Sequence, residues 1–166
     1  MTIHIRPLGP GDEQLLRTTR LRALRDAPAA FGTTYEVAAA RDDDFWKHQV
    51  AGHLGDQRCA TWVAGDGAGM ITALDDGDHT ELIQVWVTPE HRGTGLVDRL
   101  LDHAIQWSRH DCIELDVGAA NERARRAYER LGFIEVGRHA GGTGDEITMT
   151  LRRRDRRSPR ASRSTP

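Results

Sequence analysis

The sequence predicts an α/β domain whose mixed, mostly antiparallel β-sheet is flanked by helices. Three strand-like runs are separated by turns rich in Gly and Asp, which is typical of an antiparallel meander: Arg58–Ala64, Met70–Leu74 and Glu81–Val87. A helical segment and another strand follow, so that Glu81–Val117 forms a β–α–β unit. Such a unit implies a parallel strand pair with a right-handed crossover. With 166 residues, the chain is long enough for one domain with a substantial core.

One strand and two helices are expected before the meander. Ile3–Leu8 alternates between apolar and polar residues and is interrupted by a proline, as a short first strand would be. Asp12 is placed to cap a helix that runs to about Arg25, and the Pro- and Gly-containing segment Ala27–Gly32 breaks that helix. A second helix, Phe45–Val50, follows three aspartates whose charges suit the positive end of a helix dipole.

Two more helices and three more strands are expected after the meander. Leu96–His110 carries an apolar stripe at helical spacing, and Ile113–Val117 is the strand that follows it. Asn121 is placed to cap the next helix, which ends at Gly132. Two strand-like runs then close the domain: Phe133–Arg138 and Glu146–Leu151.

Residues 152–166 differ from the rest of the chain in charge. They hold seven Arg and one Asp, about +6, and removing them from the total of −2 leaves about −8 for the body. An acidic body favours a cationic partner such as an amine. The tail could contact nucleic acid or anionic lipid, but it lacks interleaved aromatic residues, so we favour a solvated end. We expect a folded domain over residues 1–151 and a disordered basic tail over residues 152–166.

The composition also indicates the cellular compartment and whether disulfides or a metal are expected. No apolar run approaches the roughly 20 residues of a membrane span, and the first residues lack an apolar signal region, so we expect a cytoplasmic protein. Two cysteines, Cys59 and Cys112, do not make a disulfide framework. The eight histidines show no metal-ligand spacing, so we expect no metal.

A glycine loop joins the strand that ends at Val87 to the helix that begins at Leu96. It reads Thr88-Pro89-Glu90-His91-Arg92-Gly93-Thr94-Gly95. Free backbone N–H groups, a helix N-terminus and one arginine would surround a single point, and such a point attracts a phosphate or pyrophosphate. The loop lacks the Gly-Lys-Ser/Thr of a P-loop and the third glycine of the dinucleotide fingerprint, and a kinase glycine loop would lie in a strand hairpin.

A second segment, about thirty residues downstream, narrows the choice of ligand. Asn121 and Tyr128 are seven residues apart, two helical turns, and therefore share one face. Read alone, Asn121 is explained as a helix cap and Tyr128 as a core tyrosine. Their occurrence together with the upstream loop favours a functional role.

Both segments resemble the GNAT superfamily of N-acetyltransferases. Val87-x-Pro89-x-x-Arg92-Gly93-x-Gly95-Leu96 is similar to its acetyl-coenzyme A signature, Arg/Gln-x-x-Gly-x-Gly/Ala, with Val97 where Gly or Ala is usual. Asn121-x-x-Ala124-x-x-x-Tyr128-x-x-x-Gly132-Phe133 is similar to the downstream part of the pattern. Arg20-Leu21-Arg22-Ala23-Leu24 with Pro28-x-Ala30-Phe31 resembles a bacterial subset, and the likeness covers roughly residues 3–151.

The resemblance implies a single-domain GNAT-like fold whose sheet is splayed between the fourth and fifth strands. It implies direct transfer, in a ternary complex, of an acetyl group from acetyl-CoA to a primary amine, either a small molecule or a peptide Lys or N-terminus. No metal takes part in this chemistry. The residues that would bind the cofactor are Val85, Val87, Arg92, Gly93, Thr94, Gly95, Leu96 and Asn121.

Two residues are candidates for proton transfer. Tyr128 would protonate the departing thiolate, and Glu81 matches the position of a frequent general base in the family. Regular alternation predicts that Glu81 lies on the same side of its strand as Ile83, Val85 and Val87, although an exposed strand-end glutamate is an equal interpretation.

Other functions and the partners stay open at this stage. A non-catalytic acyl-CoA-binding regulatory module would keep the loop, and a nucleic-acid-binding protein would act through the Arg-rich tail. The sequence does not identify the acceptor amine. A homodimer is open as well, because many relatives are dimers.

Overall fold

A computed structural model describes residues 2–55, 58–142 and 144–153 of the chain. Its helices and strands follow one another in this order: β1 Ile5–Pro7, α1 Glu13–Asp26, the 3-10 helix η1 Pro28–Ala30, α2 Tyr35–Ala39, α3 Asp43–Gly55, β2 Cys59–Ala64, β3 Gly69–Asp75, β4 Thr80–Val87, the 3-10 helix η2 Pro89–His91, α4 Leu96–Trp107, β5 Cys112–Gly118, α5 Glu122–Arg130, β6 Ile134–Gly141 and β7 Gly144–Arg152. No helix within these ranges is long and apolar enough to cross a membrane.

The strands form one mixed sheet in the order β1-β2-β3-β4-β5-β7-β6. Neighbouring described strands pair antiparallel except β4 and β5, which pair parallel. That parallel pairing joins Thr80–Leu82 to Ile113–Leu115 and goes no further. The fourth and fifth strands therefore diverge towards their carboxyl ends, which confirms both the mixed sheet and its splay.

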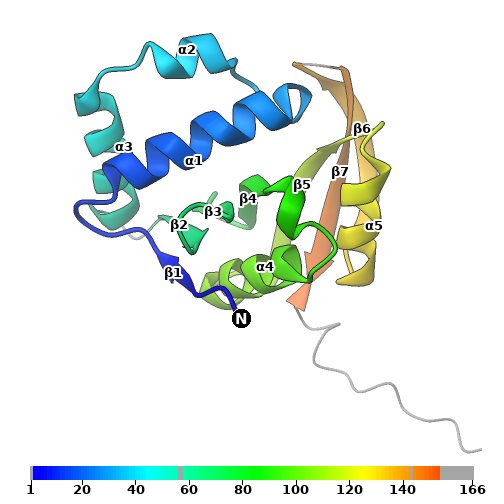
Figure 1. Cartoon of the computed structure of the whole chain (residues 1–166). Helices are drawn as coiled ribbons and strands as arrows, with labels where there is room; N and C mark the ends of the chain where they lie inside the picture. Colours follow the sequence, from blue (N-terminus) through cyan, green and yellow to red (C-terminus); the bar gives the residue numbers. More distant parts are fainter. Residues whose placement is uncertain (1, 56–57, 143, 154–166) are drawn as a thin grey trace, which may run out of the picture.

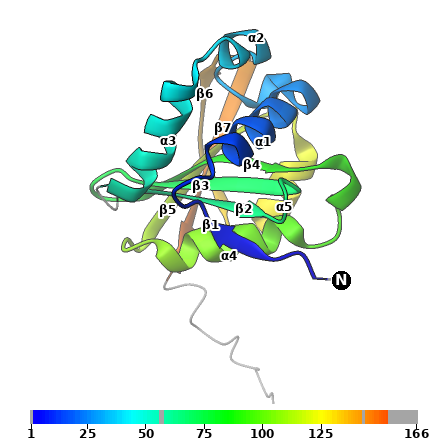
Figure 2. The same cartoon turned by 60° about the vertical axis from the view of Figure 1, so that its left-hand side comes forward.

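Helices cover both faces of this sheet (Figures 1 and 2). On one face, α1, α2 and α3 enclose a core cluster that includes Leu24, Trp46 and Trp86. On the other face, α4 and α5 pack on a larger cluster that includes Leu100 and Phe133. The amphipathic stripe of α4 is thus buried against the sheet as the sequence predicts.

The helices α2 and α4 differ from the sequence prediction. The helix α2, five residues long, lies just beyond the segment Ala27–Gly32 that was expected to break α1, where the sequence predicts no element, and it is too short to leave a readable apolar period. The helix α4 ends at Trp107 rather than near His110, because Ser108 leaves the helical conformation and its hydroxyl bonds to Thr80.

The basic segment begins inside the fold. Arg152 is the last residue of β7 and pairs with Cys112 of β5. The Arg153 N–H donates to the Asp111 carbonyl at 2.9 Å. The remainder of the tail expected from the sequence, residues 154–166, lies outside the described residues.

The alternation of side chains along β4 is interrupted at Gln84, whose φ is +57°. Ile83 pairs with Thr72 of β3, and Trp86 pairs with Met70. Two residues of β4 therefore lie opposite the single residue of β3 between Met70 and Thr72, which is the geometry of a β-bulge.

Because of the bulge, Glu81 points to a different face of the sheet from Val85 and Val87. Leu82 and Val87 both belong to the core cluster under α4, although an unbroken strand would point them to opposite faces. Glu81 therefore shares with Ile83 the face that α1 and α3 cover, whereas Val85 packs against the opposite cluster with Val87. The prediction that Glu81 lies on the same side as Val85 and Val87 was wrong, because one inserted residue reverses the direction of every side chain beyond it.

Candidate active site

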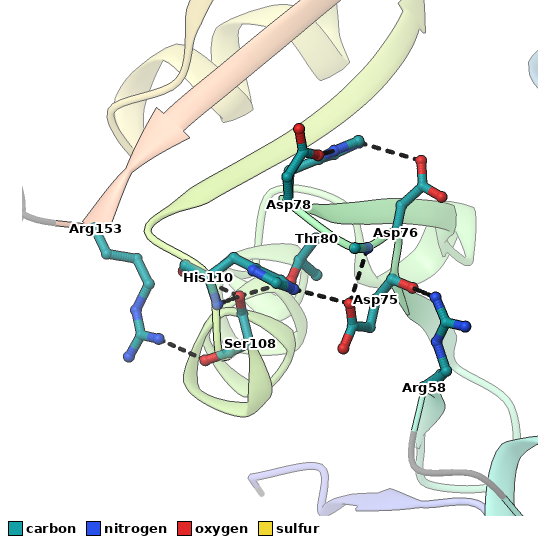
Figure 3. Close-up of polar contacts among 10 residues, drawn as sticks. Arg58, Asp75, Asp76, Asp78, Thr80, Ser108, His110 and Arg153 are labelled. Atoms are coloured by element: carbon teal, nitrogen blue, oxygen red, sulfur yellow. Dashed lines mark hydrogen bonds and ion pairs between the residues drawn. The ribbon is translucent and has the colours of Figure 1, made fainter.

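At one end β4 and β5 are paired, and a polar network holds them together there (Figure 3). We call this region the closed end. Thr80 Oγ1 and Ser108 Oγ lie 2.7 Å apart and are buried. Ser108 Oγ also accepts from the His110 N–H at 3.1 Å, and the His110 Nε2 atom lies 2.8 Å from Asp75 Oδ1. Arg153 donates to the Ser108 carbonyl. These bonds tie the start of β4 to the chain that enters β5.

A cavity of about 1130 Å³ opens where the two strands diverge, and we call this region the open end. It reaches from the end of α1 past β4 to the start of α4 and the inner face of α5. A crevice at the carboxyl ends of parallel strands is the usual ligand site of such sheets. The predicted site residues that line it are Val85, Val87, Arg92, Gly93, Gly95, Leu96, Asn121 and Tyr128. Thr94 and Glu81 are not among its lining residues.

The glycine loop presents the N-terminus of α4 to this cavity. Gly95 precedes the helix with φ of +81°, a left-handed conformation that glycine adopts without strain. The first helical hydrogen bond runs from the Arg99 N–H to the Gly95 carbonyl at 3.2 Å, so the N–H groups of Leu96, Val97 and Asp98 have no partner within the helix. These groups and the helix dipole make the loop suitable for an anion.

Arg92 is not free in this structure. Its Nε atom donates to the Val87 carbonyl at 3.2 Å, and its Nη2 atom forms an ion pair with Asp26 at the end of α1. The same Asp26 carboxylate accepts from the Trp86 indole N–H at 2.8 Å. An anion bound in the cavity would compete with Asp26 for the Arg92 guanidinium. Sequence reasoning missed Asp26, because it lies 66 residues before Arg92 with no motif to connect them.

The helix α5 contributes both the predicted residues and two unforeseen ones. Asn121 accepts from the Ala124 N–H at 3.2 Å, so it caps the helix, and it also lines the cavity. Arg123 and Arg130 line the cavity on the same helix face. Their spacing of seven residues is the signal that could have revealed them. They add positive charge beside the loop, partly offset by Asp98, which lies 3.7 Å from Arg130.

Tyr128 is buried at the inner wall of this cavity. Only 6% of its surface is exposed, and its ring centroid lies 5.9 Å from that of Phe133. Burial raises the pKa of Tyr128, so the phenol stays protonated at neutral pH. No hydrogen bond to its hydroxyl is found among the residues that the structure describes. The hydroxyl is therefore available to donate to a group in the cavity.

Glu81 stands outside this cavity, in an acidic part of the opposite face. It pairs in the sheet with Glu114 of β5 and is half-buried. Burial raises the pKa of Glu81, and the nearby carboxylates of Asp76 and Asp116 raise it further. A carboxylate with a raised pKa is a stronger base, which suits a group that accepts a proton from an ammonium.

One trio of side chains has a geometry that a metal ion could use. Ligand atoms of Asp116, His139 and Glu146 lie within 4.8 Å of one another. His139 Nε2 already lies 3.2 Å from Asp116 Oδ1, and that hydrogen bond raises the pKa of His139. None of the three is among the residues that line the large cavity.

Comparison with known sequences gives one consistent result. Residues 21–133 match the sequence model of the Acetyltransferase (GNAT) family. A mycothiol acetyltransferase of Thermobispora bispora is 32% identical over 137 residues, 79% of this chain and 46% of that protein. A 5-NmdU N-acetyltransferase of Pseudomonas phage PaMx11 is 40% identical over 65 residues, 39% of this chain and 46% of that protein. The chain thus spans about half the length of these curated relatives.

Solved structures share the fold. A spermidine N-acetyltransferase from Vibrio cholerae, in complex with CoA and spermine, has a TM-score of 0.71 and 22% identity, covering 92% of this chain and 96% of that one. A Salmonella typhimurium protein solved with its cofactor acetyl-CoA has a TM-score of 0.75 and 21% identity, covering 97% and 99%. A ribosomal-protein-S5-alanine acetyltransferase from Vibrio fischeri has a TM-score of 0.78 and 15% identity, covering 93% and 95%.

Proposed function

Since the chain belongs to the GNAT family of acetyltransferases, we propose that it transfers an acetyl group from acetyl-CoA to a primary amine by direct transfer in a ternary complex. The observation that carries this proposal is the continuity of the large cavity. The cavity runs from the N-terminus of α4, which suits a pyrophosphate, to Tyr128. It also borders the part of β4 beyond Leu82, which does not pair with β5. A long thioester needs such an anion site at one end and a proton donor at the other.

The fit of acetyl-CoA rests on backbone groups. The register of β4 with β5 ends at Leu82, so the backbone of Val85 and Val87 can pair with the pantetheine arm as an added strand would. The Gly93–Leu96 segment, including Thr94, would hold the pyrophosphate through its N–H groups. Arg92 would exchange its contact with Asp26 for the pyrophosphate, and the Asn121 amide would donate to the arm.

Three groups would serve the chemical step. A backbone N–H near Val87 would stabilise the negative charge that develops on the thioester oxygen. Glu81 would accept a proton from the ammonium of the acceptor, directly or through water, so that the neutral nitrogen can attack the carbonyl carbon. As the new C–N bond forms and the C–S bond breaks, Tyr128 would protonate the departing thiolate.

The acceptor is an amine that is cationic before reaction. The face of the sheet that carries Glu81 also carries Glu114 and Asp116, and these carboxylates would raise the local concentration of an ammonium. The Vibrio cholerae relative solved with spermine, a polycation, supports the same chemistry.

The organisation of the protein follows from the same proposal. The folded domain would end near Arg153, leaving the rest of the basic tail outside the chemistry. The proposal includes a cytoplasmic location, because two cysteines are too few for the disulfide framework of a small secreted domain. The edge strand β6 exposes Ile134 and Val136, so a homodimer would form along it. Light scattering of wild-type protein and of Val136→Lys tests the dimer, which the charged variant should dissociate.

Two measurements on the purified protein test the activity. Calorimetry with acetyl-CoA in the presence of EDTA should show one binding site without any added metal. Release of free thiol from acetyl-CoA should then depend on an amine from a panel of small amines and peptides. Binding without turnover of any amine would indicate a non-catalytic acyl-CoA-binding module, and absence of binding would refute the proposal.

A further inference from the structure

A second cavity, of about 210 Å³, lies beneath α1, α2 and α3 on the face of the sheet opposite α4. Its floor includes Gln84, the residue of the β4 bulge, and its wall includes Thr33 of the loop after η1. Val85, which follows Gln84, and Ala30, three residues before Thr33, line the large cavity instead. The two cavities therefore both border the bulge, and both border the segment from η1 to Thr33, so a molecule held in the smaller one would lie near the site of acetyl transfer.

The polar groups around this second cavity are predominantly hydrogen-bond donors. They come from the guanidinium groups of Arg20 and Arg41, the Trp46 indole, the Thr33 hydroxyl and the amides of Gln49 and Gln84. No Asp or Glu is among the described residues that line it. The rest of the lining is apolar. Such a lining repels cations and attracts a small anion that has an apolar body.

Two of these donors are buried without a hydrogen-bond partner. The Nη1 atom of Arg20 and the Nε1 atom of Trp46 are both shielded from solvent, and neither has an acceptor within the described parts of the chain. Trp46 is 4% exposed. Buried donors in native structures are almost always satisfied, so two unsatisfied donors around one cavity indicate an acceptor that the chain itself does not supply.

The neighbours of Arg20 on α1 show how unusual its position is. Arg17 forms an ion pair with Asp43 at 3.1 Å, Arg22 donates to the Gly67 carbonyl at 3.3 Å, and Arg25 donates to the Tyr35 hydroxyl at 2.6 Å. Arg20 instead lies over the face of the Phe31 ring, with its Cζ atom 4.4 Å from the ring centroid. Burial lowers the pKa of Arg20 to about 10, which still leaves it cationic at neutral pH. A partly buried cation without a counter-ion costs stability, which points to a functional reason for keeping it.

We propose that the second cavity binds a carboxylate of the acceptor, so that the acceptor is an amine that also carries a carboxylate, as amino acids do. The Arg20 fork and the Trp46 N–H would hold the carboxylate oxygens. The acidic face around Glu81 would attract the ammonium of the same molecule. This inference rests on the proposed acetyl transfer and specifies its substrate class. The cavity volume suits a carboxylate with a small side chain and is too small for a nucleotide.

Matched substrates and a matched pair of variants test the proposal. A panel of amino acids is compared with the amines obtained by removing only their carboxylates, and thiol release gives kcat/KM for each. The wild-type enzyme should prefer the amino acid. In Arg20→Met, the ratio of kcat/KM for the amino acid to that for its decarboxylated amine should fall about 30-fold, the loss expected when one partner of a buried charge pair is removed. Arg17→Met, on the same helix but already paired with Asp43, should leave that ratio unchanged.

The thermal stability of Arg20→Met gives an independent test of the proposed carboxylate site. Because Arg20→Met removes a partly buried charge that lacks a counter-ion, the Tm of the free protein should rise although discrimination is lost. A merely structural arginine would give the reverse, a lower Tm with equal losses for both members of each substrate pair, and that result would overturn the proposal.

Direct binding separates this inference from the proposed function. The indole N–H resonance of Trp46, assigned by its absence from Trp46→Phe, should shift when acetate or propionate is added to the wild-type protein. No shift at saturating carboxylate would overturn the carboxylate site, whatever the enzyme acetylates. A shift together with preference for amino acids would support it. A shift in a protein that turns over no amine would support the anion site and refute acetyl transfer. Preference for the decarboxylated amines would overturn the assignment of the site to the acceptor.

Discussion

The two ends of the β4–β5 pair use similar polar groups in opposite ways. At the closed end, Thr80, Ser108, His110 and Asp75 satisfy one another, and the strands stay in register. At the open end the same strands separate, and the N–H groups at the start of α4 and the Tyr128 hydroxyl have no partner among the described residues. The closed end saturates its donors and acceptors and contributes stability, whereas the open end leaves them for a ligand. Substitutions at the two ends test that division.

The largest effect is expected for Arg92→Ala combined with Gly95→Asp at the open end. The new carboxylate would face the pyrophosphate, and the arginine that should contact it would be gone, so acetyl-CoA binding should fall below detection in calorimetry. Gly77→Asp is the matched control, because Gly77 has φ of +89° and open space around it but lies in the β3–β4 turn of the closed end. Equal loss of affinity in the control, or unchanged affinity in the double variant, would refute the loop assignment.

Tyr128→Phe should lower turnover on the true acceptor about 100-fold while leaving acetyl-CoA affinity nearly unchanged. Only a proton-donating hydroxyl is removed, and that is the usual scale for one such group. Tyr35→Phe is the control, because the Tyr35 hydroxyl bonds to Arg25 away from the large cavity. Steady-state kinetics within twofold of wild type for Tyr128→Phe would reduce Tyr128 to a packing residue.

The sequence predicted the open end better than its surroundings. The glycine loop and the Asn121–Tyr128 spacing predicted groups that the structure brings to one cavity. The β–α–β pattern predicted the parallel pair, confirmed at Thr80–Leu82. Asp26 could not be found, because its contact with Arg92 is made by tertiary packing and leaves no local pattern.

The bulge and the second cavity were hidden for different physical reasons. Gln84 is not a glycine, so its positive φ could not be read from its residue type, and the orientation of Glu81 was therefore predicted incorrectly. The unsatisfied donors of Arg20 and Trp46 come from helices α1 and α3 and meet only after these pack on the sheet. Local periodicity reports which face of a helix is apolar, not which polar groups lack partners.

Ser108→Ala tests the closed end from the side of stability. The buried Thr80 hydroxyl would lose its partner, which should cost about 1–3 kcal/mol in the free energy of unfolding, with acetyl-CoA affinity within twofold of wild type. Thr94→Ala removes an exposed hydroxyl that bonds only to the His91 carbonyl among the described contacts, so its cost should be much smaller. Urea denaturation measures both, and a Ser108→Ala variant as stable as wild type would contradict the structural role of the network.

Glu81→Gln should change the pH dependence of the rate. Burial and neighbouring carboxylates raise the pKa of Glu81, so the rate should rise as pH passes through that raised value. Without the carboxylate, the rising limb should move to higher pH, towards the pKa of the amine itself. A profile unmoved by the substitution would exclude Glu81 as the base.

The stability of the same variant serves as its control. A carboxyl whose pKa is raised on folding favours the folded state below its unfolded pKa, and that contribution is lost as pH rises through the folded pKa. Above its folded pKa the charged Glu81 therefore contributes no stability, and there the Tm of Glu81→Gln should not fall below that of the wild type.

The most direct test of the division between the two ends is an NMR titration of the backbone amides with acetyl-CoA. Chemical shifts should change most at Val85, Val87 and the Gly93–Asp98 segment, while Thr80, Ser108 and His110 stay nearly constant. The change should saturate at one equivalent with EDTA present. Shifts concentrated at the closed end, or an absence of shifts at the start of α4, would contradict the account.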